Sequence, residues 1–244
     1  MTTSSYSNID PVYSVEKVFR ARFIERVNRF VGKVCLDSGL EYAHITNTGR
    51  LEELLTRDRD VLLKRINGGK LRYRVIGVSE YGGYALIDTI TQMKVFEALI
   101  DQGLIPVFKG CSVSRYSPRV GRSQLDYIID CGGRGVFIEV KSAVLRLGKA
   151  ASYPDCPSIR GRRHIRELMK LASSGYEAHI VFIAGLPNVE CFKPYRDGDP
   201  EIDRLLREAL SSGVGVNALS VYMDSEGNIY LDNPDLPLCG EWLE

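Results

Sequence analysis

The first third of the chain consists of short apolar runs whose spacing predicts strands. Within these runs apolar and polar positions alternate, as they do along half-buried strands, and turn residues such as Asn67-Gly68-Gly69 separate them. The runs lie at residues 12–24, 30–36, 61–66, 71–78 and 84–87. A short helical turn is expected at 51–55. Several short strands in so short a segment favour a small β-barrel, of which the OB-like barrel is one form.

From about residue 85 the pattern changes to strands that alternate with amphipathic helices. Helices are predicted at 93–101, 160–172 and 201–210, and strands at 123–130, 135–140, 180–184 and 214–222. Such alternation indicates an α/β domain. The sequence therefore predicts a loose polar tail at 1–10, an OB-like domain at 11–84 and an α/β domain at 85–244.

The composition is that of an ordinary globular protein, with 44% hydrophobic and 26% charged residues. The polar stretch Met1–Ser14 lacks the apolar region of a secretory signal, and the longest apolar run, Ile180–Leu186, is too short to cross a bilayer. We therefore expect a cytoplasmic protein without membrane association. The six cysteines form no C-x-x-C pair, and because no export signal is recognised we expect reduced, mostly buried thiols, with the intracellular disulfides of hyperthermophiles as the main exception.

The formal net charge is only +1, but the charges are distributed unevenly along the chain. Residues 109–170 hold 13 Lys/Arg and 5 Asp/Glu, a net charge of +8, whereas residues 171–244 hold 4 Lys/Arg and 13 Asp/Glu, a net charge of −9. This asymmetry indicates that one face of the molecule meets a polyanion. The alternative is that folding interleaves the two segments and cancels the field.

The turn sequence Cys131–Arg134 predicts a hairpin that brings two carboxylates together. With a four-residue loop, the antiparallel register places Asp126 opposite Glu139, and strand alternation places Lys141 on the same face. Opposed carboxylates repel each other unless a cation lies between them, and hard oxygen ligands suit Mg²⁺ or Mn²⁺. The alternative is a solvated network of ions without a metal.

These three residues define a candidate catalytic centre for the metal-assisted hydrolysis of a phosphodiester bond. Asp126 and Glu139 would bind the metal, which would polarise the phosphodiester and lower the pKa of a bound water. Lys141 would orient that water and offset negative charge in the transition state. Asp155, in the loop 149–158, is a further candidate ligand.

The helix predicted at 160–172 carries a basic face. Its basic residues are Arg160, Arg162, Arg163, Arg166 and Lys170, and its apolar stripe is Ile165, Leu168, Met169 and Ala172. Because a solvated face usually mixes charges of both signs, contact with DNA phosphates is the favoured interpretation, and a plain solvated face is the alternative. His164, between the two faces, is either a hydrogen-bonded histidine at the edge of the core or a catalytic or phosphate ligand.

In the first domain, the polar segment 43–51 combines turn and cap formers with Arg50. One interpretation is a structural cap in front of a short helix. The other is a loop that binds a ligand, with Arg50 as a candidate DNA contact.

Several of these segments resemble the sugar fermentation stimulation protein (SfsA) family. The likeness is carried by Asn28-Arg29-Phe30, residues 44–54, residues 138–142, Tyr153-Pro154-Asp155 and residues 160–168. The resemblance implies an N-terminal OB-like domain and a C-terminal PD-(D/E)xK restriction-endonuclease-like domain. It also implies DNA binding, largely without sequence specificity, and a regulatory link to sugar metabolism.

Two departures from the family's pattern concern the acidic centre. Gln124 replaces an arginine that usually precedes the first acidic position, and Ser117 stands where an acidic residue is common. The missing upstream carboxylate lowers the expectation of catalysis more than that of DNA binding.

The sequence leaves three functional hypotheses: a sequence-tolerant DNA-binding protein, a Mg²⁺-dependent nuclease, and an interaction module on an inactive nuclease scaffold that binds a protein or a small ligand.

Overall fold

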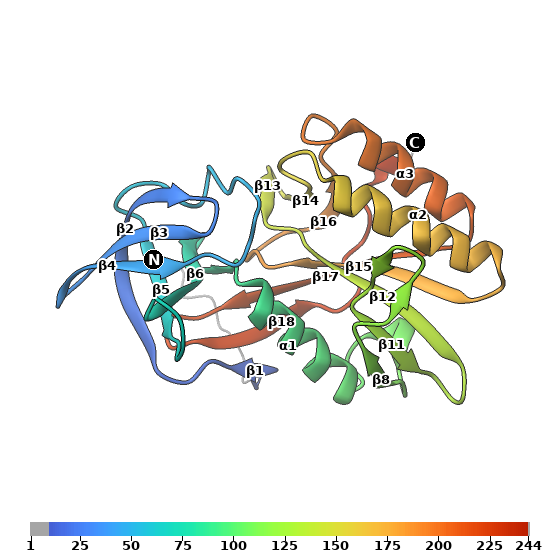
Figure 1. The fold of residues 1–244 in the computed structure, drawn as a ribbon, viewed down its shortest axis with the longest axis horizontal. Helices are drawn as coiled ribbons and strands as arrows, with labels where there is room; N and C mark the ends of the chain where they lie inside the picture. The colour runs from blue at the N-terminus through green and yellow to red at the C-terminus, as the bar shows by residue number, and fades with distance from the viewer. Residues whose placement is uncertain (1–9, 244) are drawn as a thin grey trace.

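The N-terminal part of the chain folds into a closed five-stranded barrel, at the left of Figure 1. In the computed structural model, which describes residues 10–243, its strands are β2 (Val18–Asn28), β3 (Val31–Leu36), β4 (Gly39–His44), β5 (Asp60–Arg65) and β6 (Tyr73–Glu80). They pair in the order β4-β3-β2-β5-β6, and pairing between β4 and β6 closes the barrel. The predicted barrel is confirmed, although the sequence pattern does not predict β4, the strand that closes it.

Two irregularities in β2 allow this long strand to bend around the barrel. Its register against β3 shifts between Phe23 and Glu25 and again between Arg26 and Asn28. Such shifts bend a strand and increase its twist. Inside the barrel the Phe23 ring lies against Gly32, where an added Cβ would come within 2.8 Å of the ring. A glycine at this position therefore gives the ring its space.

The C-terminal part forms an α/β domain around a mixed sheet. Its strands are β8 (Ser112–Tyr116), β11 (Tyr127–Asp130), β12 (Gly135–Ser142), β15 (Glu177–Ala184), β17 (Gly215–Met223) and β18 (Asn228–Asn233). They lie in the order β8-β11-β12-β15-β17-β18, with β12, β15 and β17 parallel and the outer pairs antiparallel. Helices α2 (Ile159–Ser173) and α3 (Pro200–Ser211) cover one face, and α1 (Thr89–Asp101) covers the other (Figure 1).

The central strand β15 shows that the sheet is buried on both faces. Ile180 and Phe182 belong to the core under α2 and α3, whereas Val181 and Ile183 belong to the core under α1. A strand buried on both sides needs a continuous apolar run, and the sequence has one here. On the neighbouring β12, the same alternation points Glu139 toward α2, where it contacts a side chain of that helix.

One sheet runs through both domains because β7 (Gly83–Leu86) pairs with β6 of the barrel and with β17 of the α/β domain. The boundary predicted at 84/85 falls within this strand. β1 (Tyr13–Ser14), from the segment assigned to the barrel, pairs with β18. The remaining elements are β9 (Arg119–Val120), β10 (Ser123–Gln124), β13 (Leu145–Leu147), β14 (Ala150–Tyr153), β16 (Cys191–Pro194), the 3-10 helix η1 (Pro106–Phe108) and α4 (Gly240–Leu243).

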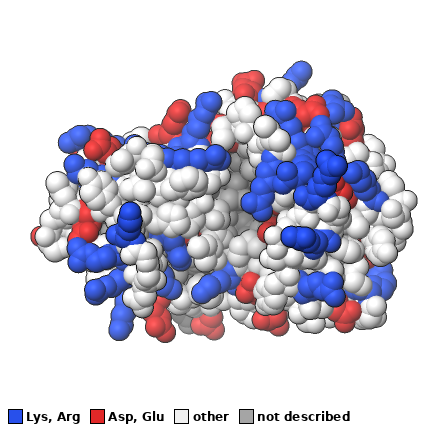
Figure 2. All heavy atoms as spheres, in the orientation of Figure 1, with Lys and Arg blue, Asp and Glu red and all other residues white. Residues whose placement is uncertain are grey.

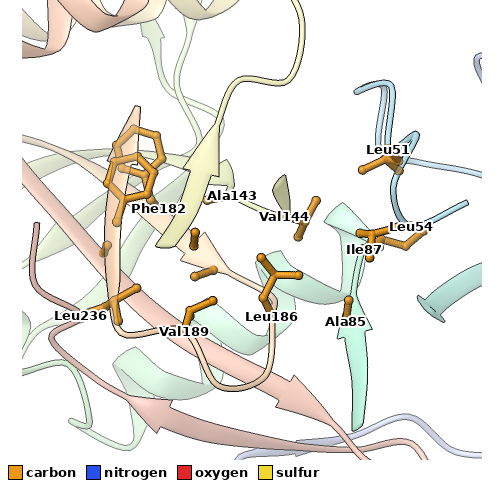
Figure 3. Close-up of a cluster of buried hydrophobic side chains, with 14 of the residues drawn as sticks. Leu51, Leu54, Ala85, Ile87, Ala143, Val144, Phe182, Leu186, Val189 and Leu236 are labelled. Carbon is orange, nitrogen blue, oxygen red and sulfur yellow. The ribbon is translucent and has the colours of Figure 1, made fainter. Parts of the chain in front are cut away.

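The two domains also share one hydrophobic core (Figure 3). Leu51 and Leu54, from the turn that follows β4, belong to the same buried cluster as Val144 and Leu186 of the α/β domain. Ile87, just after β7, belongs to it as well. Because these side chains are almost fully buried, we infer that the core holds the two domains in one orientation.

Of the tail predicted at 1–10, residues 1–9 lie outside the described part of the chain. Within residues 10–243, no helix is both long and apolar enough to cross a membrane.

The expectation of reduced cysteines is wrong for four of the six. The disulfides are Cys111–Cys131 and Cys191–Cys239, and the free thiols are Cys35 and Cys156. The bonded partners lie 20 and 48 residues apart along the chain. The spacing of cysteines along the sequence does not predict these pairs, because only the tertiary fold brings the partners together.

Removing the longer disulfide with the double substitution Cys191→Ala/Cys239→Ala is expected to lower the free energy of unfolding by about 4 kcal/mol, because the unfolded chain regains the freedom of the open loop. Removing Cys111–Cys131 should cost about 3 kcal/mol, because its loop is shorter. Urea unfolding curves measure both effects. A thiol titration of the unfolded, unreduced protein should find two free thiols per chain, and finding six would contradict the pairing.

Candidate functional site

The hairpin predicted between β11 and β12 is present, with Asp130 opposite Gly135 as expected. Asp126 lies just before β11 and is held against β12 by two hydrogen bonds. Its N–H donates to the carbonyl of the residue before Glu139 (3.2 Å), and its carboxylate accepts a bond from the Val140 N–H (2.8 Å). Asp126 is thus bonded to β12 on both sides of Glu139.

Glu139 is a buried carboxylate whose two oxygens have different surroundings. Only 1% of the residue is exposed. Its Oε1 accepts a hydrogen bond from Lys141 Nζ and contacts Nδ1 of His164. Among the residues that the structure describes, its Oε2 has no hydrogen-bond partner. Because leaving a buried carboxylate oxygen unpaired is costly, this atom is the natural ligand for a cation or a water.

The charges of this cluster shift one another's pKa values. Burial raises the pKa of Asp126 to about 6, and the charge of Glu139 adds to the effect. Burial would also raise the pKa of Glu139, but Lys141 and His164 outweigh it and lower that pKa. Burial would lower the pKa of Lys141, but the Glu139 charge raises it overall. Glu139 is therefore charged, and Asp126 loses its charge as the pH falls through about 6.

The donor atoms suit a hard divalent cation held by few protein ligands. Asp126 and Glu139 offer carboxylate oxygens, which Mg²⁺, Mn²⁺ and Ca²⁺ prefer. Within residues 10–243, no three or more His, Cys, Asp or Glu side chains gather into a metal site. A cation bound here would therefore keep several waters, as protein-bound Mg²⁺ usually does. Ser117, where the family pattern favours an acid, lies beside Asp126, and its N–H donates to the Asp126 carbonyl (2.8 Å).

Asp155, the further candidate ligand, lies where the barrel meets the α/β domain. Its Oδ2 accepts a hydrogen bond from the Leu51 N–H (2.9 Å). A Cβ added at Gly49 would come within 2.6 Å of the Asp155 carboxylate, so this carboxylate packs directly on the loop backbone. Asp155 therefore anchors the barrel segment 46–51, and it lines the same cavity as Lys141.

That cavity, of about 570 Å³, lies between the two domains. Its barrel side is formed by residues 46–49 with Arg29, and its other side includes Lys141 and the start of α2. Figure 2 shows the surface hollowed between the two domains, with basic side chains along one side. Asn47 Nδ2 donates to Ser142 Oγ across the cavity wall (3.1 Å). The polar segment is thus both structurally anchored and part of a lined cavity.

Helix α2 divides its basic residues between two surroundings. Three of them are ion-paired within the protein: Arg162 with Asp199, Arg166 with Glu201 and Lys170 with Glu167. Arg160 and Arg163 line a separate pocket, which they share with Arg119 and Arg122. The apolar stripe predicted for this helix packs into the core. Figure 2 shows Lys and Arg side chains gathered at the upper right, over α2.

His164 connects the basic helix to the acidic centre. The residue is 1% exposed, its Nδ1 contacts Glu139, and the Arg160 Nε donates to its Nε2 (3.4 Å). His164 is therefore a buried histidine that also lines the arginine pocket. Arg50, the barrel residue in the predicted DNA-binding set, is exposed, and its carbonyl accepts a hydrogen bond from Arg26.

Arg119 and Arg122 are candidates that the sequence pattern does not single out. They belong to the hairpin β9–β10, and the only signal for them is their place in the basic segment 109–170. The strand predicted at 123–130 is interrupted at Leu125 and Asp126, which separate β10 from β11. This break lets the hairpin fold over α2.

Asp199 fixes the start of α2 relative to α3. It caps α3 by accepting a hydrogen bond from the Ile202 N–H (3.2 Å), and it accepts another from the Ser158 N–H (2.9 Å), just before α2. Arg162 donates to the same carboxylate. Burial would raise the pKa of Asp199, but Arg162 and the two N–H donors lower it.

The substitution Asp199→Ala is expected to lower the free energy of unfolding by about 2 to 4 kcal/mol, because a helix cap and the partner of Arg162 are lost together. Denaturant unfolding at several pH values measures the effect. Since the pKa of Asp199 is lowered by folding, its contribution is complete above about pH 4 and is lost as the pH falls through the lowered pKa. The exposed control Asp197→Ala should change stability by less than about 0.5 kcal/mol. Equal effects of both variants at neutral pH would contradict this role.

Comparison with known proteins agrees with this architecture. The family model described as "SfsA N-terminal OB domain" matches residues 24–87, and that described as "Sugar fermentation stimulation protein RE domain" matches residues 90–227. A sugar fermentation stimulation protein homolog of Pyrococcus furiosus is 50% identical over 215 residues, which cover 88% of this chain and 94% of the relative. A homolog of Archaeoglobus fulgidus is 43% identical over 228 residues, covering 92% of this chain and 97% of the relative.

The likeness extends to three dimensions. The solved structure of Pyrococcus furiosus SfsA in complex with Ca²⁺ superposes with a TM-score of 0.92 and 47% identity, covering 95% of this chain and 100% of the other. The two family models together span most of the described residues. The chain therefore belongs to the sugar fermentation stimulation protein (SfsA) family, with an N-terminal OB domain and a C-terminal restriction-endonuclease-like domain.

Proposed function

We propose that this protein binds DNA largely without sequence preference, on the basic face that runs from the inter-domain cavity over α2. The observation that carries the proposal is that Arg160 and Arg163 meet Arg119 and Arg122 in one pocket without any acidic residue in its lining. Guanidinium groups that have no carboxylate beside them are available to phosphates, which they bind through paired N–H donors. Contacts to phosphates fix a position on DNA but carry no base information.

The other basic residues of the predicted set would contribute more weakly. Arg162, Arg166 and Lys170 already have carboxylate partners, so their charges are partly neutralised before DNA arrives. Arg50 lies exposed on the barrel side of the cavity region and would reach a strand that passes between the domains. A regulatory role in sugar metabolism, exerted in the cytoplasm through this binding, is part of the same proposal.

Replacing Arg160 and Arg163 together by glutamine should weaken DNA binding roughly tenfold and lower the slope of log affinity against log salt by about 2, because two phosphate contacts are lost. Gel shifts at increasing salt, with DNA and RNA probes, measure both quantities. Arg134→Gln/Arg204→Gln removes the same charge from exposed sites elsewhere and should change the slope little. No binding even at low salt would end the proposal, and binding indifferent to salt would remove its phosphate mechanism.

A second candidate function, a PD-(D/E)xK nuclease, is favoured by the free Oε2 of Glu139 beside Asp126. The structure of the Pyrococcus furiosus relative was solved in complex with Ca²⁺, which supports the binding of a divalent cation by this chain. A bound Mg²⁺ or Mn²⁺ would supply Lewis acidity toward a phosphodiester. Lys141 would orient the attacking water and offset charge on the transition state. His164 would hold the Glu139 carboxylate in place, and Asp155 stays a candidate for a further ligand.

Incubation of DNA with Mg²⁺ or Mn²⁺ should produce cleavage that falls at least about a hundredfold in Glu139→Ala and in Lys141→Ala, because each removes one part of the centre. Asp130→Asn, on the same hairpin but outside the centre, should leave cleavage unchanged. Product formation on denaturing gels gives the rates. Cleavage that survives both alanine substitutions would point to a contaminating nuclease and refute the assignment.

A further inference from the structure

A second pocket, of about 490 Å³, lies between the β9–β10 hairpin and α2. Its lining residues are Arg119, Gly121, Arg122, Ser123, Gln124, Arg160, Arg163 and His164. Four of these eight are arginines, and none is an aspartate or glutamate. Like charges gathered in this way repel one another unless an anion lies between them.

The arginines of this pocket differ from the other basic residues of α2, which form ion pairs within the protein. Within residues 10–243, no ion pair joins Arg119, Arg122, Arg160 or Arg163 to a carboxylate. One turn further along α2, Arg166 has its own acidic partner. The acidic C-terminal segment therefore neutralises one part of the helix and leaves this part open.

The β9–β10 hairpin is held against α2 by direct contacts, which fix the position of its arginines. Arg163 Nε donates to Oγ of Ser123 (3.1 Å), which is only 4% exposed. At the turn, Gly121 has φ +56°, and an added Cβ would come within 2.8 Å of the Glu167 carboxylate. Glycine alone adopts this conformation at this distance without strain. The hairpin thus rests directly on the helix, with Arg122 beside the contact.

Arg160 and His164 connect the pocket to the inter-domain cavity and to the acidic centre. Arg160 lines both this pocket and the inter-domain cavity. His164 lines the pocket and contacts Glu139 on its other side. A strand whose end is held between the arginines would continue past Arg160 into the inter-domain cavity, which Lys141 lines.

We propose that this pocket binds the terminal phosphate of a nucleic acid strand, an inference that rests on the proposed DNA binding. A terminal phosphomonoester carries about two negative charges and three free acceptor oxygens, whereas an internal phosphodiester carries one charge and two such oxygens. Several guanidinium groups around one concavity match the former, because each offers paired N–H donors to phosphate oxygens. The protein would thus recognise strand ends and hold them next to its acidic centre.

The test compares DNA duplexes of one sequence that end in a 5′-phosphate, in a 3′-phosphate, or in hydroxyl groups only. Fluorescence anisotropy in the presence of a metal chelator measures affinity without cleavage. The wild-type protein should bind one phosphorylated form at least about tenfold more tightly than the hydroxyl form, and that form identifies the end that is recognised. In Arg119→Gln/Arg122→Gln the ratio should fall below about twofold, whereas the charge-matched control Arg134→Gln/Arg204→Gln should keep it.

Equal binding of all three forms by the wild-type protein would overturn the inference while leaving DNA binding intact. A preference that survives in Arg119→Gln/Arg122→Gln would overturn it too. If no form binds, the proposed function itself fails. Inorganic pyrophosphate then tests whether the pocket binds phosphate groups at all. It should raise the melting temperature of the wild-type protein but not that of the variant, and an unchanged melting temperature would remove the phosphate site as well.

Discussion

The site depends on one constraint, the burial of a charged carboxylate within a sheet that is apolar on both faces. Glu139 lies between Ile138 and Val140, which pack into the core under α1. A charge in such a place is tolerated only with partners. Lys141 supplies one from the same strand, and His164 supplies another from α2. The contacts of Glu139 Oε1 therefore link the sheet to the basic helix. Its Oε2, which has no partner among the described residues, is available to a cation or a water.

The relation between the two domains follows from packing and not from a flexible linker. A shared sheet through β7 and a shared core around Leu54, Val144 and Leu186 join the barrel to the α/β domain. Polar contacts from Asp155 and Asn47 add to this link at the cavity itself. We infer that the cavity is largely preformed, so that a strand entering it meets Lys141 and the start of α2 without a large rearrangement.

The structure pairs some basic side chains of residues 109–170 with acids of the C-terminal segment and leaves others without such partners. Acidic side chains after residue 171, such as Asp199 and Glu201, cancel the charges of Arg162 and Arg166. Among the described residues, no acid pairs with Arg160 and Arg163 of α2 or with Arg119 and Arg122 of the β9–β10 hairpin, and these four arginines line a pocket without acids. The group of arginines without acidic partners is therefore smaller than the +8 segment suggests, and it adjoins the acidic centre through His164.

By itself the sequence determined what depends on neighbours along the chain. Alternation predicted most of the barrel strands, helical periodicity predicted the core stripe of α2, and the turn Cys131–Arg134 predicted the register that brings Asp126 near Glu139. Only the tertiary structure decided which distant residues meet: the two disulfides, the closing strand β4, the partners of each arginine, and the place of Asp155 on the barrel loop. The reason is physical, since periodicity reports which face of an element is buried, whereas long-range contacts depend on how separate elements pack.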